Sequence, residues 1–209
     1  MFDWFKKKQQ VEPVRSPEVL GLRLGGAVEL DDLKFRLIEP DLTIEGAART
    51  QLIKAVGQVE LDQQTRLLRF YTDDDGYFQV LQNGTTDADV MEVKLVYFYQ
   101  TKPIDTEQQW ENWLATELLL ANQMLDGQEF YKAWDNERPV AMTEKTWFED
   151  GSVSETDQFV MVYEREINAE LFEGLQLIAE EKLENNQLQR SVVFSTSIDV
   201  SPTDFNIVG

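Results

Sequence analysis

The sequence predicts an α+β fold that is rich in β-structure, in which antiparallel hairpins form a meander packed with one main amphipathic helix at about residues 106–125. Three observations predict this fold class. Short runs of alternating apolar and polar residues recur along most of the chain. Asp-Gly pairs at Gly76 and Gly151 separate such runs, as hairpin turns do. Residues 106–125 carry the one long helical repeat.

The chain is predicted to divide into a flexible N-terminal tail, residues 1–20, and a single β-rich globular domain, residues 21–209. A chain of 209 residues, of which 42% are hydrophobic, is long enough to bury a sizeable core. The Asp-Gly hairpins on either side of the predicted helix leave a second arrangement open, in which the domain consists of two β subunits around that helix.

The tail begins with aromatic residues followed by lysines, and Pro13 and Pro17 then prevent a continuous helix. Aromatic residues beside lysines are typical of segments that lie at a membrane interface. A frayed chain end and docking onto the protein's own body or onto a partner are favoured over a membrane anchor, because only about five residues carry the apolar part. The candidate residues for contact with a partner or a membrane are Phe2, Trp4, Phe5, Lys6, Lys7 and Lys8.

The first structured segment shows a strand-like alternation from Val28 to Leu37, interrupted at Asp31 and Asp32. This pattern predicts a short hairpin that turns at the two aspartates. Residues 41–61 fit either a short helix or a strand, and the pattern favours a strand from Val56 onward.

The run Tyr-Thr-Asp-Asp-Asp-Gly, residues 71–76, lies between two alternating segments, so it is predicted to be a hairpin turn in which Gly76 supplies a positive φ. An EF-hand calcium loop would need acidic residues where this chain has Tyr71 and Gln82. An Asp-x-Asp pattern, known from metal-dependent sugar transferases, occurs at 73–75 and at 87–89, but the α/β framework of such enzymes is missing. We therefore expect a turn and no metal site.

The next segments are a strand at 91–99, apolar on both faces and therefore expected well inside the structure, and the helix at 106–125. Thr106 and Gln109 have capping-box spacing, and Asp126-Gly127 is predicted to end the helix. Its tryptophans are expected in the core, with a ligand platform or a partner surface as alternatives. The apolar positions are Trp110, Trp113, Leu114, Leu118, Ala121, Met124 and Leu125.

The C-terminal third is predicted to be mostly β-structure. Residues 129–134 form a candidate strand, and 143–148 with 159–165 form a second hairpin with a longer, acidic loop. Residues 169–183 fit a helix or a strand, and Gly174 favours a strand that pairs with the alternating segment 192–200.

The composition excludes several classes of chemistry. The chain has 19 Lys and Arg against 39 Asp and Glu, a formal charge of -20, which disfavours nucleic acid as a partner. It has no cysteine and no histidine, so thiol nucleophiles, Ser-His-Asp triads and Cys or His zinc sites are ruled out. We predict no catalytic residues, no cofactor and no metal. The sequence shows no apolar run long enough to span a membrane, so we expect a cytoplasmic protein, with a position peripheral to the inner membrane as an alternative.

Three stretches of the chain suggest a family. They are Pro-Glu-Val-Leu-Gly-Leu-Arg-Leu-Gly-Gly-Ala-Val-Glu-Leu at 17–30, Arg-Phe-Tyr-Thr-Asp-Asp-Asp-Gly-Tyr-Phe-Gln-Val at 69–80 and Ser-Thr-Ser-Ile-Asp-Val-Ser-Pro-Thr-Asp-Phe at 195–205. With them the chain resembles the YjfK-like bacterial proteins of unknown function from residue 17 onward. The resemblance implies a cytosolic β-rich domain without established activity. It also implies genes beside those of phage-shock-like membrane-remodelling proteins, small membrane proteins and glutathionylspermidine-synthase-like enzymes.

These observations favour a non-catalytic interaction or adaptor protein that works with a protein partner in a membrane-associated or envelope-stress system. The alternative is a binding module for a small cationic ligand such as a polyamine, since the chain is strongly acidic. An enzyme that uses carboxylates or a lysine is a third possibility. The candidate ligand-binding residues are Asp73, Asp75, Asp87 and Asp89.

Overall fold

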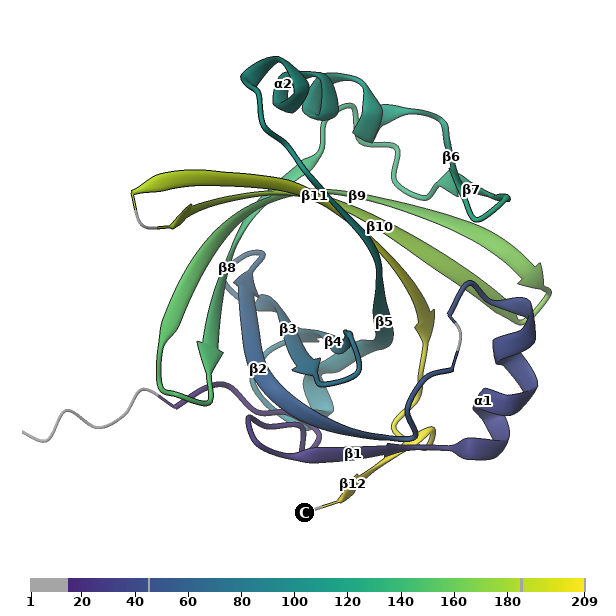
Figure 1. The fold of residues 1–209 in the computed structure, drawn as a ribbon. Coiled ribbons are helices and arrows are strands. Elements are labelled where there is room, and N and C mark those ends of the chain that lie inside the picture. The colour runs from purple at the N-terminus through teal and green to yellow at the C-terminus, as the bar shows by residue number, and fades with distance from the viewer. Residues whose placement is uncertain (1–14, 45, 185, 209) are drawn as a thin grey trace, which may run out of the picture.

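The computed structural model describes residues 15–44, 46–184 and 186–208, and its centre is a closed ring of antiparallel strands (Figure 1). The ring closes because β8 pairs with β9 on one side and with β2 on the other. We call the space inside this ring the lumen. In order around the ring, the strands are β2 (Thr50–Glu60), β3 (Thr65–Thr72), β4 (Gly76–Asn83), β5 (Val90–Pro103), β11 (Gln187–Asp199), β10 (Leu171–Glu184), β9 (Val153–Asn168) and β8 (Val140–Phe148).

Alternation along the strands separates lumen-facing from outward-facing side chains, as β3 shows. Its residues Leu67, Arg69 and Tyr71 line cavities in the lumen, whereas Leu68 and Phe70 are buried in a core outside the ring. Both faces of the sheet are therefore covered or enclosed along much of this strand. The largest hydrophobic clusters lie outside the ring, between it and two covering layers.

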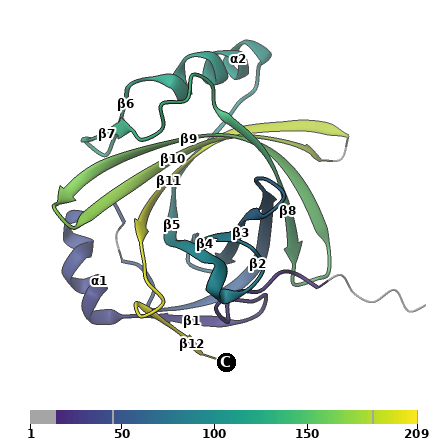
Figure 2. The ribbon, with the colours of Figure 1, turned by 180° about the vertical axis from the view of Figure 1, so that it is seen from behind.

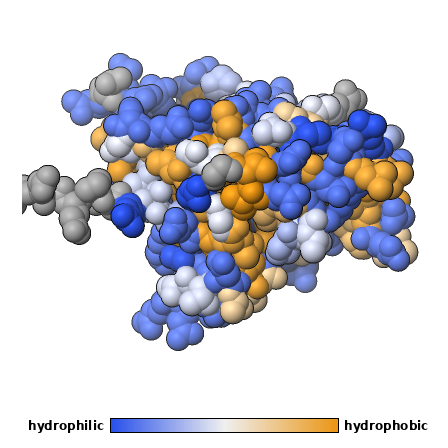
Figure 3. All heavy atoms as spheres, turned by 90° about the horizontal axis from the view of Figure 1, so that it is seen from below, coloured by the Kyte–Doolittle hydropathy of each residue, from blue (hydrophilic) through white to orange (hydrophobic). Residues whose placement is uncertain are grey.

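The first covering layer consists of β1 (Ala27–Leu30), α1 (Asp32–Ile38), the 3-10 helix η1 (Glu39–Asp41) and β12 (Phe205–Val208). In Figure 1, β1 and β12 lie below the ring and α1 lies at its lower right. β1 joins the sheet by pairing with β2 and β12. Phe78 of β4 and Phe205 of β12 pack with ring centroids 5.2 Å apart. Val19, from the segment assigned to the tail, is also buried in this core. Seen from this side, the surface is largely hydrophilic with apolar residues gathered near its middle (Figure 3).

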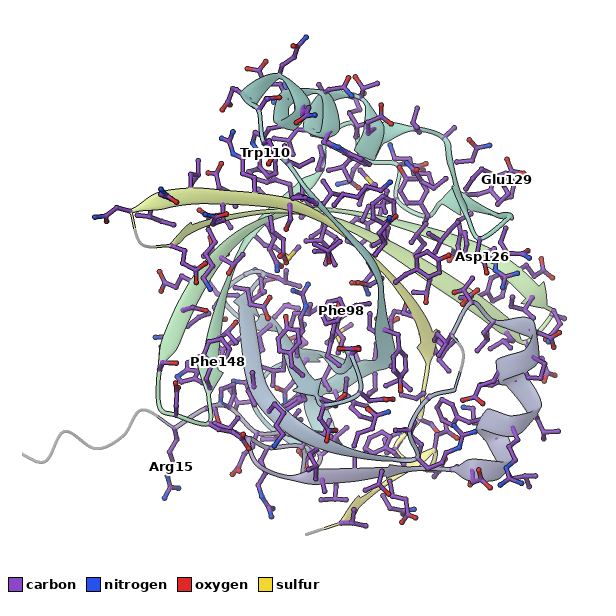
Figure 4. The ribbon with its side chains drawn as sticks, in the orientation of Figure 1. Arg15, Phe98, Trp110, Asp126, Glu129 and Phe148 are labelled. Atoms are coloured by element: carbon purple, nitrogen blue, oxygen red, sulfur yellow. The ribbon has the colours of Figure 1, made fainter. Side chains whose placement is uncertain are left out.

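The second covering layer lies on the opposite side of the ring, as Figures 1 and 2 both show. Its core joins Trp110 to Phe130 and to the outward-facing residues of β9, β10 and β11. Figure 4 shows Trp110 between the helix α2 and the sheet. The elements of this layer are α2 (Glu107–Ala115), the 3-10 helix η3 (Glu117–Leu119), β6 (Asn122–Leu125) and β7 (Gln128–Lys132).

The structure confirms a β-rich fold of antiparallel hairpins. The predicted hairpins are β3–β4 and β8–β9, and the ambiguous segment 169–183 is a strand that pairs with the last long strand. The strand predicted at 91–99 lies between β4 and β11. In the part of the chain that the structure describes, no helix is both long enough and apolar enough to cross a membrane.

The hairpin predicted from Val28 to Leu37 is wrong, because the chain forms β1 and then the helix α1. Asp31 does not turn a hairpin; its side chain caps the helix by accepting a hydrogen bond of 2.7 Å from the Lys34 N–H. Phe35 is buried whereas Leu33 and Leu37 are exposed, so the alternating apolar residues do not share one face.

The single amphipathic helix at 106–125 is also wrong in its extent. Thr106 caps it as predicted, accepting from the Gln109 N–H, but the helix ends at Ala115. Residues 122–125 form strand β6, which pairs with β7. The helical spacing of apolar residues in the sequence continues past residue 115 because Leu118 and Leu125 are both buried. Leu118 lies on the 3-10 helix η3, however, and Leu125 on strand β6.

The turn between β3 and β4 needs one smaller correction. The residue with a positive φ is Asp75, at 50°, and not Gly76. Gly76 is instead required by space, because a Cβ there would lie 2.5 Å from the carbonyl oxygen of Val96.

Candidate functional site

A buried polar layer crosses the lumen, and Arg69 of β3 is at its centre. The side chains of Arg69 and Glu144 are 2% and 3% exposed. Arg69 Nη1 donates hydrogen bonds of 2.7 Å to Glu144 Oε2 and of 2.7 Å to Gln158 Oε1, and Nε donates one of 3.2 Å to Gln79 Oε1. Four strands, β3, β4, β8 and β9, thus meet at a single guanidinium group.

Glu144 receives further donors that complete the layer. The Tyr71 hydroxyl donates to Glu144 Oε1 at 2.8 Å, and Gln158 Nε2 donates to Glu144 Oε2 at 3.0 Å. The same Gln158 Nε2 also donates to Glu180 Oε1 at 2.9 Å. The carboxylate of Glu144 is therefore matched by one cation and two neutral donors, which is what a buried charge requires.

The protonation states of this layer are fixed near neutral pH. Burial opposes the charge of Arg69, but the Glu144 carboxylate together with Tyr77 and Tyr71 outweighs it and raises the Arg69 pKa above its usual value. Burial, together with Glu144, raises the pKa of Tyr71 well above its usual value, and burial raises the pKa of Tyr77 to about 12. Both phenols are neutral and Arg69 is charged.

Local sequence and strand register explain how the layer is built. Arg69 is directly opposite Gln79 across β3 and β4, and Gln158 is opposite Glu180 across β9 and β10. Gly57 of β2 leaves the space that Glu144 occupies, because a Cβ on residue 57 would lie 1.7 Å from Glu144 Oε1.

The larger cavity lies on one side of this layer and has a volume of about 570 Å³. Near its rim, Lys94 forms ion pairs with Asp199 and, at 3.0 Å, with Glu92. Glu164 also lines it. The apolar part of the lining consists of Leu61, Leu67, Leu81, Ala133, Trp134, Val140, Met142, Val160, Val162 and Phe172.

The smaller cavity, of about 290 Å³, lies on the other side, and Arg69 lines both. Strand β10 shows the division: Phe172, Gly174 and Gln176 line the larger cavity, and the inward-facing residues that follow line the smaller one. The residues that line the smaller cavity include aromatic, aliphatic and charged side chains, among them Tyr71, Tyr77, Phe98, Phe148, Ile178, Val193, Glu144, Glu180 and Lys182. The lumen thus consists of two chambers separated by the polar layer.

The four aspartates predicted to bind a ligand lie at opposite ends of β4 and line neither chamber. Asp73 and Asp75 are in the β3–β4 turn, and Asp87 and Asp89 are in the 3-10 helix η2 (Asp87–Asp89). Because β4 has 8 residues, the two pairs are roughly 25 Å apart along the strand. The structure does not bring the two pairs together.

Three of these carboxylates have local structural partners. Asp73 Oδ1 accepts from the Leu52 N–H at 2.7 Å, and Asp87 Oδ1 accepts from the Leu20 N–H at 2.8 Å. Asp89 Oδ2 accepts from the N–H and the hydroxyl of Thr86. Among the described residues, no group of three or more acidic, cysteine or histidine side chains is arranged to hold a metal ion.

Sequence reasoning missed the lumen because its residues come from strands far apart in the chain. One signal was present: Arg69 interrupts the apolar run from Leu67 to Phe70, and a charge in such a run indicates a buried partner or a functional group. The predicted contact residues of the tail, Phe2, Trp4, Phe5, Lys6, Lys7 and Lys8, lie outside the described residues, so that role stays a prediction.

Comparison with known proteins gives a family and one curated relative. The family described as "Protein of unknown function (DUF2491)" matches residues 1–206. "Uncharacterized protein YjfK" from Escherichia coli (strain K12) is 29% identical over 217 residues, which covers 98% of this chain and 96% of the relative. No solved structure was found to match.

Proposed function

Because this chain belongs to the DUF2491 family of proteins of unknown function, we base the function that we propose on the geometry of the lumen. The protein is a non-catalytic binding protein that holds a small organic molecule with an apolar body in the larger chamber. The observation that carries this proposal is a largely apolar cavity of about 570 Å³ inside a closed sheet.

The size and the walls of the chamber support it. Small-molecule sites have volumes of roughly 300–1,000 Å³ and are lined mainly by apolar side chains with a few polar groups. The larger chamber measures about 570 Å³, and its inner wall includes Val160 and Val162 of β9 and Met142 of β8. A ring of eight strands is wide enough to hold one small ligand.

The rim provides a second argument. Leu61, Trp134 and Phe172 are 42%, 36% and 47% exposed, and all three line the same chamber. Each Å² of apolar surface at the rim that a ligand covers, and so removes from water, contributes about 25 cal/mol to the free energy of binding. A bound molecule would remove part of this surface from water, so the rim itself contributes to binding.

The polar groups of the chamber indicate a ligand with one polar end. The Lys94 ammonium is neutralised by Glu92 and Asp199. Glu164, which follows Val160 and Val162 in the inward-facing row of β9, forms no ion pair with any described residue. A hydroxyl or amino group on the ligand would suit this acceptor, while the apolar body lies against the valines and Met142.

The electrostatics support binding without reaction. Arg69 and Tyr71 hold their protons through neutral pH, because the Glu144 carboxylate raises the pKa of Arg69 against the effect of burial, and burial together with Glu144 raises the pKa of Tyr71. Neither group can therefore exchange a proton with a ligand near pH 7. The role with a protein partner that the sequence predicted is a separate proposal, which depends on residues outside the described part of the chain.

A fluorescence titration with the neutral probe N-phenyl-1-naphthylamine tests the proposal. We expect saturable binding with one site per chain. Val162→Phe, which fills the chamber, should weaken it at least tenfold. Val153→Phe is the matched control, since residue 153 is on the same strand but exposed and lines neither chamber. Absence of saturable binding, or equal affinity in the two variants, would overturn the assignment of the chamber.

A further inference from the structure

Three aromatic rings stand together on the wall of the smaller chamber. Ring centroids are 5.0 Å apart for Tyr71 and Tyr77, 5.5 Å for Tyr77 and Phe98, and 6.4 Å for Tyr71 and Phe98, the last pair nearly parallel at 7°. All three residues line the chamber. Phe98 is 41% exposed, and Figure 4 shows it inside the ring of strands. Part of the cluster is therefore accessible to a ligand.

A carboxylate without a cationic partner shares this chamber. Glu180 Oε1 accepts a hydrogen bond of 2.9 Å from the amide of Gln158, but within the described chain Glu180 forms no ion pair. Glu144, the other carboxylate of the chamber, is already paired with Arg69. Burial, and then the charge of Glu144, raise the pKa of Glu180 above its usual value. Glu180 thus lies where a positive charge would stabilise it.

Lys182 is the one other basic residue that lines this chamber besides Arg69. It is the next inward-facing residue after Glu180 on β10, yet its ammonium group is in no ion pair with a described residue. The charges of Arg69 and, to a lesser extent, Lys182 lower the pKa of Glu180, but burial and Glu144 raise it by more. Lys182 therefore competes weakly for the position that a ligand cation would take.

Aromatic faces and a partly buried carboxylate together select one chemical class. The negative face of an aromatic ring attracts cations, and it does so best with cations that are weakly hydrated. A divalent metal ion would need several oxygen ligands, whereas Glu180 is the single carboxylate without an ion-pair partner among the described residues that line this chamber. An alkylated ammonium group has its charge spread over methyl groups, which pack against rings.

We propose that the smaller chamber is a second binding site, which takes an alkylated ammonium group between the rings of Tyr71 and Phe98 and the carboxylate of Glu180. Tyr77 completes the aromatic cluster but is buried, and the Arg69 guanidinium already lies 5.6 Å from the centre of its ring. This site does not depend on the ligand of the larger chamber, because the Arg69 layer separates the two. It also differs from the acidic turns at 73–75 and 87–89, which line neither chamber.

Calorimetry of the full chain with choline tests this site, and 3,3-dimethylbutan-1-ol, which has the same shape without the charge, is the comparison ligand. The titrations are done at about 0.15 M salt, where charges more than about 8 Å apart are largely screened. We expect saturable binding of choline and none of the alcohol. Binding of both ligands with similar affinity, or of neither, would overturn the proposal.

Matched variants separate a site from general attraction to an acidic protein. Glu180→Gln keeps the shape and the acceptor for Gln158, and it should weaken choline binding about tenfold, in line with a desolvated cation contact. Glu184→Gln removes the same charge from the same strand at an exposed position and should leave affinity unchanged. Equal weakening by the two variants would mean general attraction and would refute the site.

Two more variants test the aromatic rings and the competition from the Lys182 ammonium group. Phe98→Leu keeps an apolar side chain but removes the ring, and it should weaken choline binding several-fold with an unchanged circular dichroism spectrum. Lys182→Gln should strengthen binding. Val162→Phe, which blocks the larger chamber, should leave choline affinity unchanged, so failure of one site is distinguishable from failure of the other. A loss of choline binding in Val162→Phe would contradict the separation of the two chambers.

Discussion

The buried Arg69–Glu144 pair gives the sharpest prediction about stability. Arg69→Met keeps much of the side-chain volume but removes the guanidinium, which donates three hydrogen bonds, to Glu144, Gln158 and Gln79. Leaving a buried carboxylate without its cation costs about 3–5 kcal/mol. Glu144 keeps its donors Tyr71 and Gln158, so we expect a loss near the lower end, about 3 kcal/mol.

Urea unfolding of the parent protein and of Arg69→Met measures this loss of stability, provided that the free energy of unfolding depends on urea concentration with the same slope in both proteins. Lys54→Met is the control, because the Lys54–Glu149 pair is 3.5 Å long and about half exposed on both sides, and an exposed pair contributes about 0–1 kcal/mol. The double variant Arg69→Met with Glu144→Met should regain part of the loss, since no buried charge then remains. If Arg69→Met costs no more than Lys54→Met, the polar layer does not stabilise the closed sheet as we describe.

The other predictions concern neighbours of the same layer. Gly57→Ala should lower the free energy of unfolding by about 1–3 kcal/mol, because the new Cβ would lie 1.7 Å from Glu144 Oε1. The same substitution should cost less in a Glu144→Ala background, and a double-variant cycle by urea unfolding measures the difference. If the effects of the two substitutions simply add, the predicted contact is contradicted. Glu180→Gln should change how stability depends on pH. The pKa of Glu180 is raised in the folded state, so above the ordinary value of 4.5 the folded protein binds more protons than the unfolded one. The parent protein therefore loses stability as the pH rises from 4.5 through the folded-state pKa of Glu180. The variant lacks this loss, so its stability relative to the parent should increase as the pH rises above 4.5 in urea titrations, and a constant difference would show that the pKa of Glu180 is not perturbed.

Local sequence determined the hairpins of this protein and the classes of chemistry it lacks. The alternation on both sides of the Asp73–Gly76 run predicted β3 and β4, and their register follows from the turn that joins them. Residues 169–183 were ambiguous in periodicity, yet Gly174 indicated the strand that β10 is. The missing cysteine and histidine removed whole groups of mechanisms without any structural information.

Short apolar segments misled sequence reasoning where two periodicities fit equally well. The alternation of Leu33, Phe35 and Leu37 is typical of a strand, but in the structure these residues belong to a helix that Asp31 caps. Leu118 and Leu125 fit one helix, but they reach the same core from a 3-10 helix and from strand β6. In both cases packing against the sheet, and not local preference, decided the backbone.

Only the tertiary structure decided that the sheet closes and what the lumen contains. Val56 of β2 pairs with Trp147 of β8, and Arg69 meets Glu144 across 75 positions of the sequence. Periodicity shows which face a residue is on but not which distant strand faces it, so inward-facing charges look like ordinary surface residues until closure pairs them. The four aspartates drew attention because they are neighbours in sequence, whereas the lumen residues become neighbours only when the ring of strands closes.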